Sequence, residues 1–209
     1  MRRLDILRSW VREATSKVYD RTLAALPLDS LRELVDDLKH RRVRIPEAAL
    51  TRAIAHAAMV EEAQVHARDG ALYVDARFRG DRPPFEAIVR PVAGAFAPRG
   101  AKELVFHLDP PEAAAHPMAA EVLSCLAGVI AHHLWAPAGL RAEADPGGAF
   151  VERDHGAAFR VDLRTVPSVR ALLEGPAGAV ITEALVPREL VASEGALKIE
   201  LAMPALFGP

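Results

Sequence analysis

The sequence predicts an α+β protein in which a curved antiparallel sheet packs on a long central apolar helix, with extra helices at the N-terminus. One observation is the run 118–135, which is apolar around almost the whole helical circumference. The other is a series of segments in which apolar and polar side chains alternate, as in half-buried strands. An apolar helix of this kind is buried, and an antiparallel sheet with one apolar face can cover it.

The predicted helix 118–135 follows two prolines, Pro110 and Pro111, which suit the entry to a helix. Its polar side chains Glu121, Ser124 and His132, with Gly128 between the last two, fall on one narrow face at steps of three and four residues. The carboxylate and the histidines disfavour a helix that crosses a bilayer. We therefore expect a buried helix in a globular protein.

Four strands are predicted ahead of this helix, at 61–68, 72–78, 85–96 and 103–108, with a hairpin turn at Asp69-Gly70 between the first two. The clearest lies within 71–78, where Leu72, Val74 and Phe78 share one face. Pro91 places an edge or a bulge in the strand predicted at 85–96. After the long helix, the patterns predict strands at 140–144, 150–152, 159–163, 179–186, 190–192 and 197–203, and a short helix at 168–173.

The N-terminal segment 1–26 predicts a basic amphipathic helix, and we expect it to contact a membrane surface or a partner through Arg3, Leu7, Trp10 and Val11. The alternative is a helix that packs on its own domain or pairs in a homo-oligomer. Further helices are predicted at 31–40 and 47–59. The basic cluster 39–44 fits a helix C-terminus, with a phosphate or lipid-headgroup site as the alternative.

We expect residues 27–209 to form one domain that contains a weak internal repeat of 45–78 and 166–203. In each segment a proline opens a helix, an extended run follows, and Gly-Ala-Leu comes next, at Gly70 and at Gly195. An acidic residue precedes each glycine. Chance similarity in an alanine-rich chain is the alternative to duplication.

The bulk composition excludes some classes of function. The net charge of −2 and the aromatic content of 5% give no sign of a nucleic-acid partner. The single Cys125 lies among apolar residues and is expected to be a core residue. Without a recognisable signal peptide, the chain is expected to be cytoplasmic, at most peripheral to the inner membrane. Its abundant alanine, arginine and proline indicate a GC-rich, bacterial genome.

No motif for catalysis, a cofactor or a metal ion is found in the sequence, so we expect none of the three. His132 and His133 are adjacent and would point about 100° apart on a helix, so they cannot share one ion. Asp154 and His155 sit in a predicted turn, which disfavours an acid–base pair. An enzyme that uses Glu121, with His107 and Asp109, remains as an alternative.

The order of elements, with a helix before the strand Gly-Ala-Leu-Tyr-Val-Asp-Ala-Arg-Phe at 70–78 and a long apolar helix after the meander, resembles the tubular lipid-binding (TULIP) superfamily. The resemblance covers about 45–203. It implies a non-catalytic module that holds a lipid or other amphiphile between helix and sheet. The expected lining residues are Leu72, Val74, Phe78, Leu104, Phe106, Val122, Leu126, Val129 and Ile130. A scaffolding protein that assembles through its N-terminal helix is the alternative.

Overall fold

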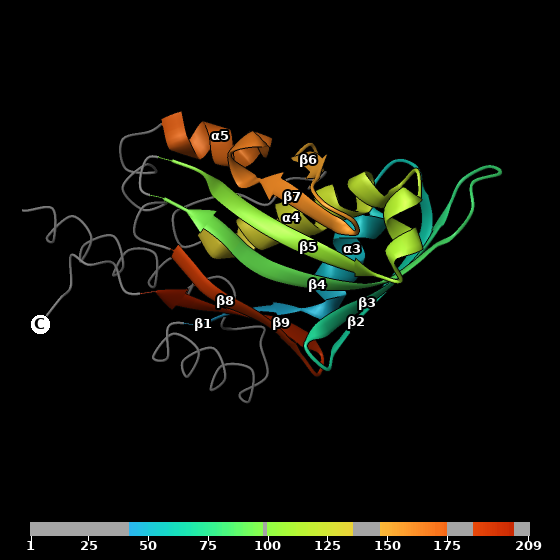
Figure 1. The fold of residues 1–209 in the computed structure, drawn as a ribbon, viewed down its shortest axis with the longest axis horizontal. Helices are drawn as coiled ribbons and strands as arrows, with labels where there is room; N and C mark the ends of the chain where they lie inside the picture. The colour runs from blue at the N-terminus through green and yellow to red at the C-terminus, as the bar shows by residue number, and fades with distance from the viewer. Residues whose placement is uncertain (1–41, 98–99, 136–146, 175–185, 203–209) are drawn as a thin grey trace, which may run out of the picture.

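The computed structural model describes residues 42–97, 100–135, 147–174 and 186–202, and it confirms the α+β class. The strands within these residues form two antiparallel sheets instead of one (Figure 1). The six-stranded sheet has the order β2 (Val60–Arg68), β3 (Ala71–Phe78), β4 (Phe85–Phe96), β5 (Lys102–Asp109), β7 (Ala158–Asp162) and β6 (Phe150–Arg153). The three-stranded sheet has the order β1 (Arg42–Pro46), β9 (Ala196–Ala202) and β8 (Val186–Ser193).

The helices of the described residues are α3 (Glu47–Ala55), α4 (Ala119–Trp135) and α5 (Pro167–Glu174), with 3-10 helices η2 (Pro111–Ala115) and η4 (Leu163–Thr165). In Figure 1, α4 lies behind β4 and β5, and the three-stranded sheet lies below them. Helix α4 contacts α3, β1, β6 and β7. Buried side chains from both sheets and from α3, α4 and α5 form one hydrophobic cluster.

Alternation in the six-stranded sheet follows the sequence pattern. In β5, Leu104, Phe106 and Leu108 are buried, as predicted, whereas His107 and Asp109 are exposed. The hairpin predicted around Asp154-His155-Gly156 is confirmed as β6–β7. The period of two thus fixes which face of each strand enters the core.

Strand β4 is not an edge strand, contrary to one reading of Pro91, because it lies between β3 and β5. Its pairing with β3 ends at Val89, while its pairing with β5 continues past Pro91 to Phe96. Pro91 therefore stands where no β3 residue needs its missing N–H. An irregularity does occur nearby, between Ala93 and Phe96.

Of the basic cluster 39–44, Arg42 and Arg44 lie in strand β1, and the rest of the cluster before Arg42 is outside the described residues. The two arginines pair with Glu200 and Lys198 of β9, and Ile45 is fully buried in the hydrophobic cluster. Arginine and apolar residues alternate at 42–45, as in a strand, but the partner strand comes from the far end of the described chain, so this pairing has no local signal.

Strand β2 is at the edge of the six-stranded sheet, and side chains from α3 cover its unpaired side. The Val65 N–H donates to Thr51 Oγ1 at 3.0 Å, and the Ala67 N–H donates to Glu47 Oε2 at 3.2 Å. Helix α3 ends at Ala55, earlier than predicted, and the chain turns into β2 at Val60. These bonds satisfy donors that an uncovered edge strand would offer to another chain.

The two sheets meet where the β2–β3 and β8–β9 hairpins touch. The Gly70 N–H donates to the Ala192 carbonyl at 3.0 Å, and the Gly195 N–H donates to the Ala67 carbonyl at 3.1 Å. The two bonds are reciprocal. Each hairpin donates through the N–H of a glycine and accepts at the carbonyl of an alanine three residues before that glycine. Both glycines belong to the Gly-Ala-Leu triplets of the predicted repeat.

Helix α4 is tied to the start of β6 through Ser124, one of the polar residues on its predicted narrow face. Ser124 is buried, and its hydroxyl donates to the Ala149 carbonyl at 3.3 Å and accepts from the Ala149 N–H at 2.9 Å. A buried backbone donor and acceptor are thereby satisfied by one side chain.

Several predictions fall outside the described residues. These are the helices at 1–26 and 31–40 with Arg3, Leu7, Trp10 and Val11, the strand at 140–144, and most of the strand at 179–186. Among the helices that are described, none has the length and apolar character needed to cross a membrane.

Replacing Gly70 or Gly195 with alanine is expected to lower the free energy of unfolding by about 1 to 2 kcal/mol each. Their φ angles are +75° and +74°, and an added Cβ would meet nothing within 4 Å, so the cost arises from the backbone conformation alone. Urea denaturation measures it. Gly70→Asn is the matched control and should cost less, because asparagine tolerates this conformation; equal losses for Asn and Ala would contradict the explanation.

Ser124→Ala is expected to destabilise the protein by about 1 to 3 kcal/mol, because the buried N–H and carbonyl of Ala149 lose their partner. Thermal or denaturant unfolding tests this. Ser193→Ala is the control, since its hydroxyl makes one long bond of 3.5 Å. Similar effects for the two serines would show that the Ser124 bridge contributes no particular stability.

Candidate functional site

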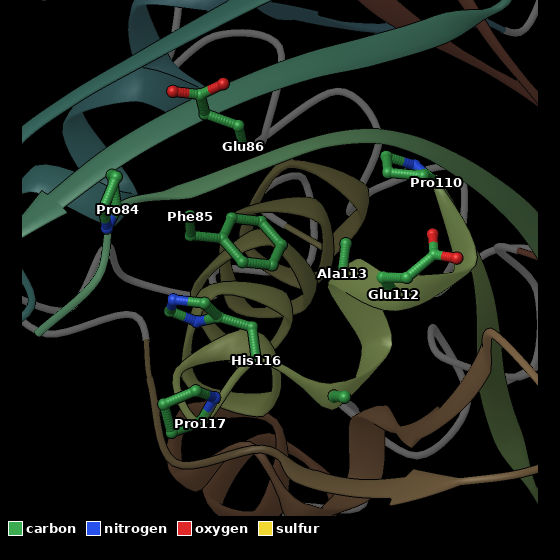
Figure 2. Close-up of a pocket in the computed structure, with 9 residues that line it drawn as sticks. Pro84, Phe85, Glu86, Pro110, Glu112, Ala113, His116 and Pro117 are labelled. Atoms are coloured by element: carbon green, nitrogen blue, oxygen red, sulfur yellow. The ribbon is translucent and has the colours of Figure 1, made fainter.

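A groove lies between the start of β4 and the segment that joins β5 to α4 (Figure 2). Its volume is about 560 Å³. Two short stretches supply its walls, one before and within β4 and one through η2. The lining residues are Pro84, Phe85, Glu86, Pro110, Glu112, Ala113, Ala115, His116 and Pro117.

Two aromatic rings lie at the base of the groove, where His116 is half-buried and covers Phe85, which is 1% exposed. The Phe85 ring meets the His116 ring edge to face at a centroid distance of 5.4 Å, and Figure 2 shows the two side chains close together beside Ala113. On its other side His116 stacks on Phe78 at 5.8 Å. Phe78 and Phe85 are buried in the core cluster, so the groove floor continues directly into the core.

His116 also joins the two walls by hydrogen bonds. The Met118 N–H donates to His116 Nδ1 at 3.1 Å, which makes Nδ1 the acceptor nitrogen. Nε2 then carries the hydrogen and donates to the Pro83 carbonyl at 3.1 Å. One side chain therefore fixes the β3–β4 loop against the start of α4.

Two carboxylates, those of Glu86 and Glu112, stand at the rim. Both side chains are exposed, and neither forms an ion pair with any residue that the structure describes. In Figure 2 the Glu112 carboxylate extends toward Pro110, and that of Glu86 points away from the Phe85 ring. The groove thus combines an apolar base with a negatively charged rim.

The residues predicted to line an amphiphile site are brought together, but in the core. All are at most 7% exposed and belong to one hydrophobic cluster: Leu72, Val74, Phe78, Leu104, Phe106, Val122, Leu126, Val129 and Ile130. None of them lines the groove, although the Phe78 ring stacks on His116, which does line it. The seam between helix and sheet is therefore filled by side chains at these positions.

The residues weighed for catalysis are dispersed over the surface. Glu121, His107 and Asp109 are exposed, and Asp109 pairs with Arg90 at 3.6 Å. Because Glu121 is exposed, it lacks the burial that typically marks a functional carboxylate. Within the described ranges, no three histidine, cysteine or acidic side chains are placed to hold a metal ion.

Sequence reasoning missed the groove as a site. Pro84, Pro110 and Pro117 line its walls, and of these only Pro110 was interpreted from the sequence, as a helix-entry signal. Comparison with known protein families, with curated proteins and with solved structures gave no match to this chain.

Away from the groove, His133 on α4 has a lowered pKa. Burial disfavours its charged form, and nearby Arg52 adds repulsion, while the hydrogen bond from Nδ1 to the Val129 carbonyl opposes the shift. In the window between the folded pKa and the usual value near 6.5, the unfolded chain binds a proton that the folded chain does not.

Stability should therefore fall as the pH is lowered from about 6.5 through the folded pKa of His133. His133→Gln should flatten this part of the stability profile, measured by urea denaturation across the pH range. His155→Gln, at an exposed turn position, is the control and should follow the parent protein. An unchanged profile for His133→Gln would contradict the assignment.

Proposed function

We propose that this protein is a non-catalytic binding module for a small amphiphile, and that the groove between β4 and η2 is its site. The observation that carries the proposal is a cavity of about 560 Å³ with an aromatic base, lined by Phe85, Ala113 and His116. Small-molecule sites in proteins typically have volumes of about 300 to 1,000 Å³ and mostly apolar walls.

The walls favour binding because they are held in place before a ligand arrives. Prolines at 84, 110 and 117 restrict the backbone, and His116 links the walls by hydrogen bonds to Pro83 and Met118. A preformed site loses little conformational entropy on binding. The apolar part of the ligand would lie over Phe85 and Ala113, and its polar part would face solvent at the rim.

The proposal keeps the ligand class implied by the resemblance to the tubular lipid-binding superfamily, and it places the ligand at the mouth of the helix–sheet seam instead of within it. In this view the curved sheet and the long apolar helix are the scaffold behind the site. Phe78, one of the residues predicted to line the seam, supports the base of the groove through His116.

Ala115→Phe is expected to weaken amphiphile binding at least about tenfold, because a ring at this lining position would occupy the groove. Titration of the full chain with decyl maltoside below its critical micelle concentration, followed by backbone amide chemical shifts, measures the Kd. Ala115 is exposed, so the larger side chain should leave the core intact.

Ala48→Phe on the exposed face of α3 is the matched control, because it adds the same apolar surface elsewhere. It should bind decyl maltoside like the parent protein. If the parent shows no shifts at Phe85, Ala113 or His116, or if Ala115→Phe binds as tightly as Ala48→Phe, the groove is not the site.

A further inference from the structure

We infer that the amphiphile bound in the groove carries a cationic head group, such as an ammonium group on an alkyl chain. This inference rests on the proposed function and adds the charge of the ligand to it. The juxtaposition that carries it is an aromatic base at Phe85 and His116 beneath a rim formed by Glu86 and Glu112.

The charged side chains that line the groove all have one sign. Its lining contains the carboxylates of Glu86 and Glu112 and no lysine or arginine. His116, the one basic side chain of the lining, engages its two nitrogens with Met118 and Pro83. An anionic head group would therefore meet repulsion at the rim, whereas a cation would meet attraction.

The rim carboxylates differ from several carboxylates on or beside the six-stranded sheet that have cationic partners. Asp109 pairs with Arg90 at 3.6 Å, and Asp154 pairs with Arg160 at 3.0 Å. Asp162 accepts two hydrogen bonds from Arg164 Nε, at 2.9 and 3.0 Å. Glu86 and Glu112 have no such partner among the described residues, so their charge is available to a ligand.

The apolar surface of the groove favours the same ligand. It comes from Ala113 and the half-buried His116 ring, because Phe85 is only 1% exposed, and the methylene groups next to an ammonium centre pack on such a surface. The cavity of about 560 Å³ suits a small molecule. A cationic amphiphile therefore fits the groove better than an extended polypeptide.

Three probes with the same decyl chain test the inference on the full protein: decyltrimethylammonium, decyl maltoside and decyl sulfate, each below its critical micelle concentration. Chemical-shift titrations give their Kd values at the groove. We expect the cation to bind most tightly and the sulfate most weakly. The preference should shrink as salt is added, because the rim charges are exposed.

Glu112→Gln and Glu86→Gln should each weaken decyltrimethylammonium binding by roughly two- to fivefold, the range for an exposed ion pair. Both should leave decyl maltoside binding unchanged. Glu189→Gln on β8, in the other sheet, removes the same charge from an exposed position and should have no effect.

The outcomes separate this inference from the proposed function. Equal Kd values for the three probes would overturn the cationic ligand and leave the amphiphile site standing. Absence of binding by all three would overturn the proposed function itself. If N-acetyl-lysine methylamide binds more tightly than decyltrimethylammonium, the groove recognises a basic side chain, and the amphiphile assignment is wrong.

Discussion

The two sheets of this protein depend on a reciprocal pair of backbone hydrogen bonds between hairpin tips. Gly70 and Gly195 each donate to an alanine carbonyl of the other hairpin. The geometry requires positive φ at both glycines and a close approach of two turns. Because these bonds join segments 125 residues apart, they connect the start and the end of the described chain and set the position of β8 beside β2, β3 and β4.

The groove results from a second junction, in which His116 joins the β3–β4 loop to the start of α4. Its ring also covers Phe78 and Phe85, so one side chain closes the core and forms the base of the groove. The site is therefore a consequence of how the core is sealed at this end of the sheet.

Much of the fold could be predicted because it depends on local patterns. Alternation identified the inward faces of β3 and β5, and Asp69-Gly70 identified the hairpin turn, where Asp69 also has positive φ. The division into two sheets could not be predicted, because β1 becomes a strand only by pairing with β9. Likewise, Ser124 could be recognised as a polar residue on an apolar helix. Its hydrogen-bond partner could not be predicted, because Ala149 is 25 residues away.

The sequence by itself determined the α+β class, the positions of most strands and the apolar residues of the core, since each follows from the period of its own segment. It also placed Leu126, Val129 and Ile130 together with Leu104 and Phe106, in a cluster that the structure shows to be core. Only the tertiary structure decided that the groove lies elsewhere, at Phe85, Glu112 and His116. The reason is physical: a concave surface arises from the relative placement of segments, and no single segment's pattern encodes that placement.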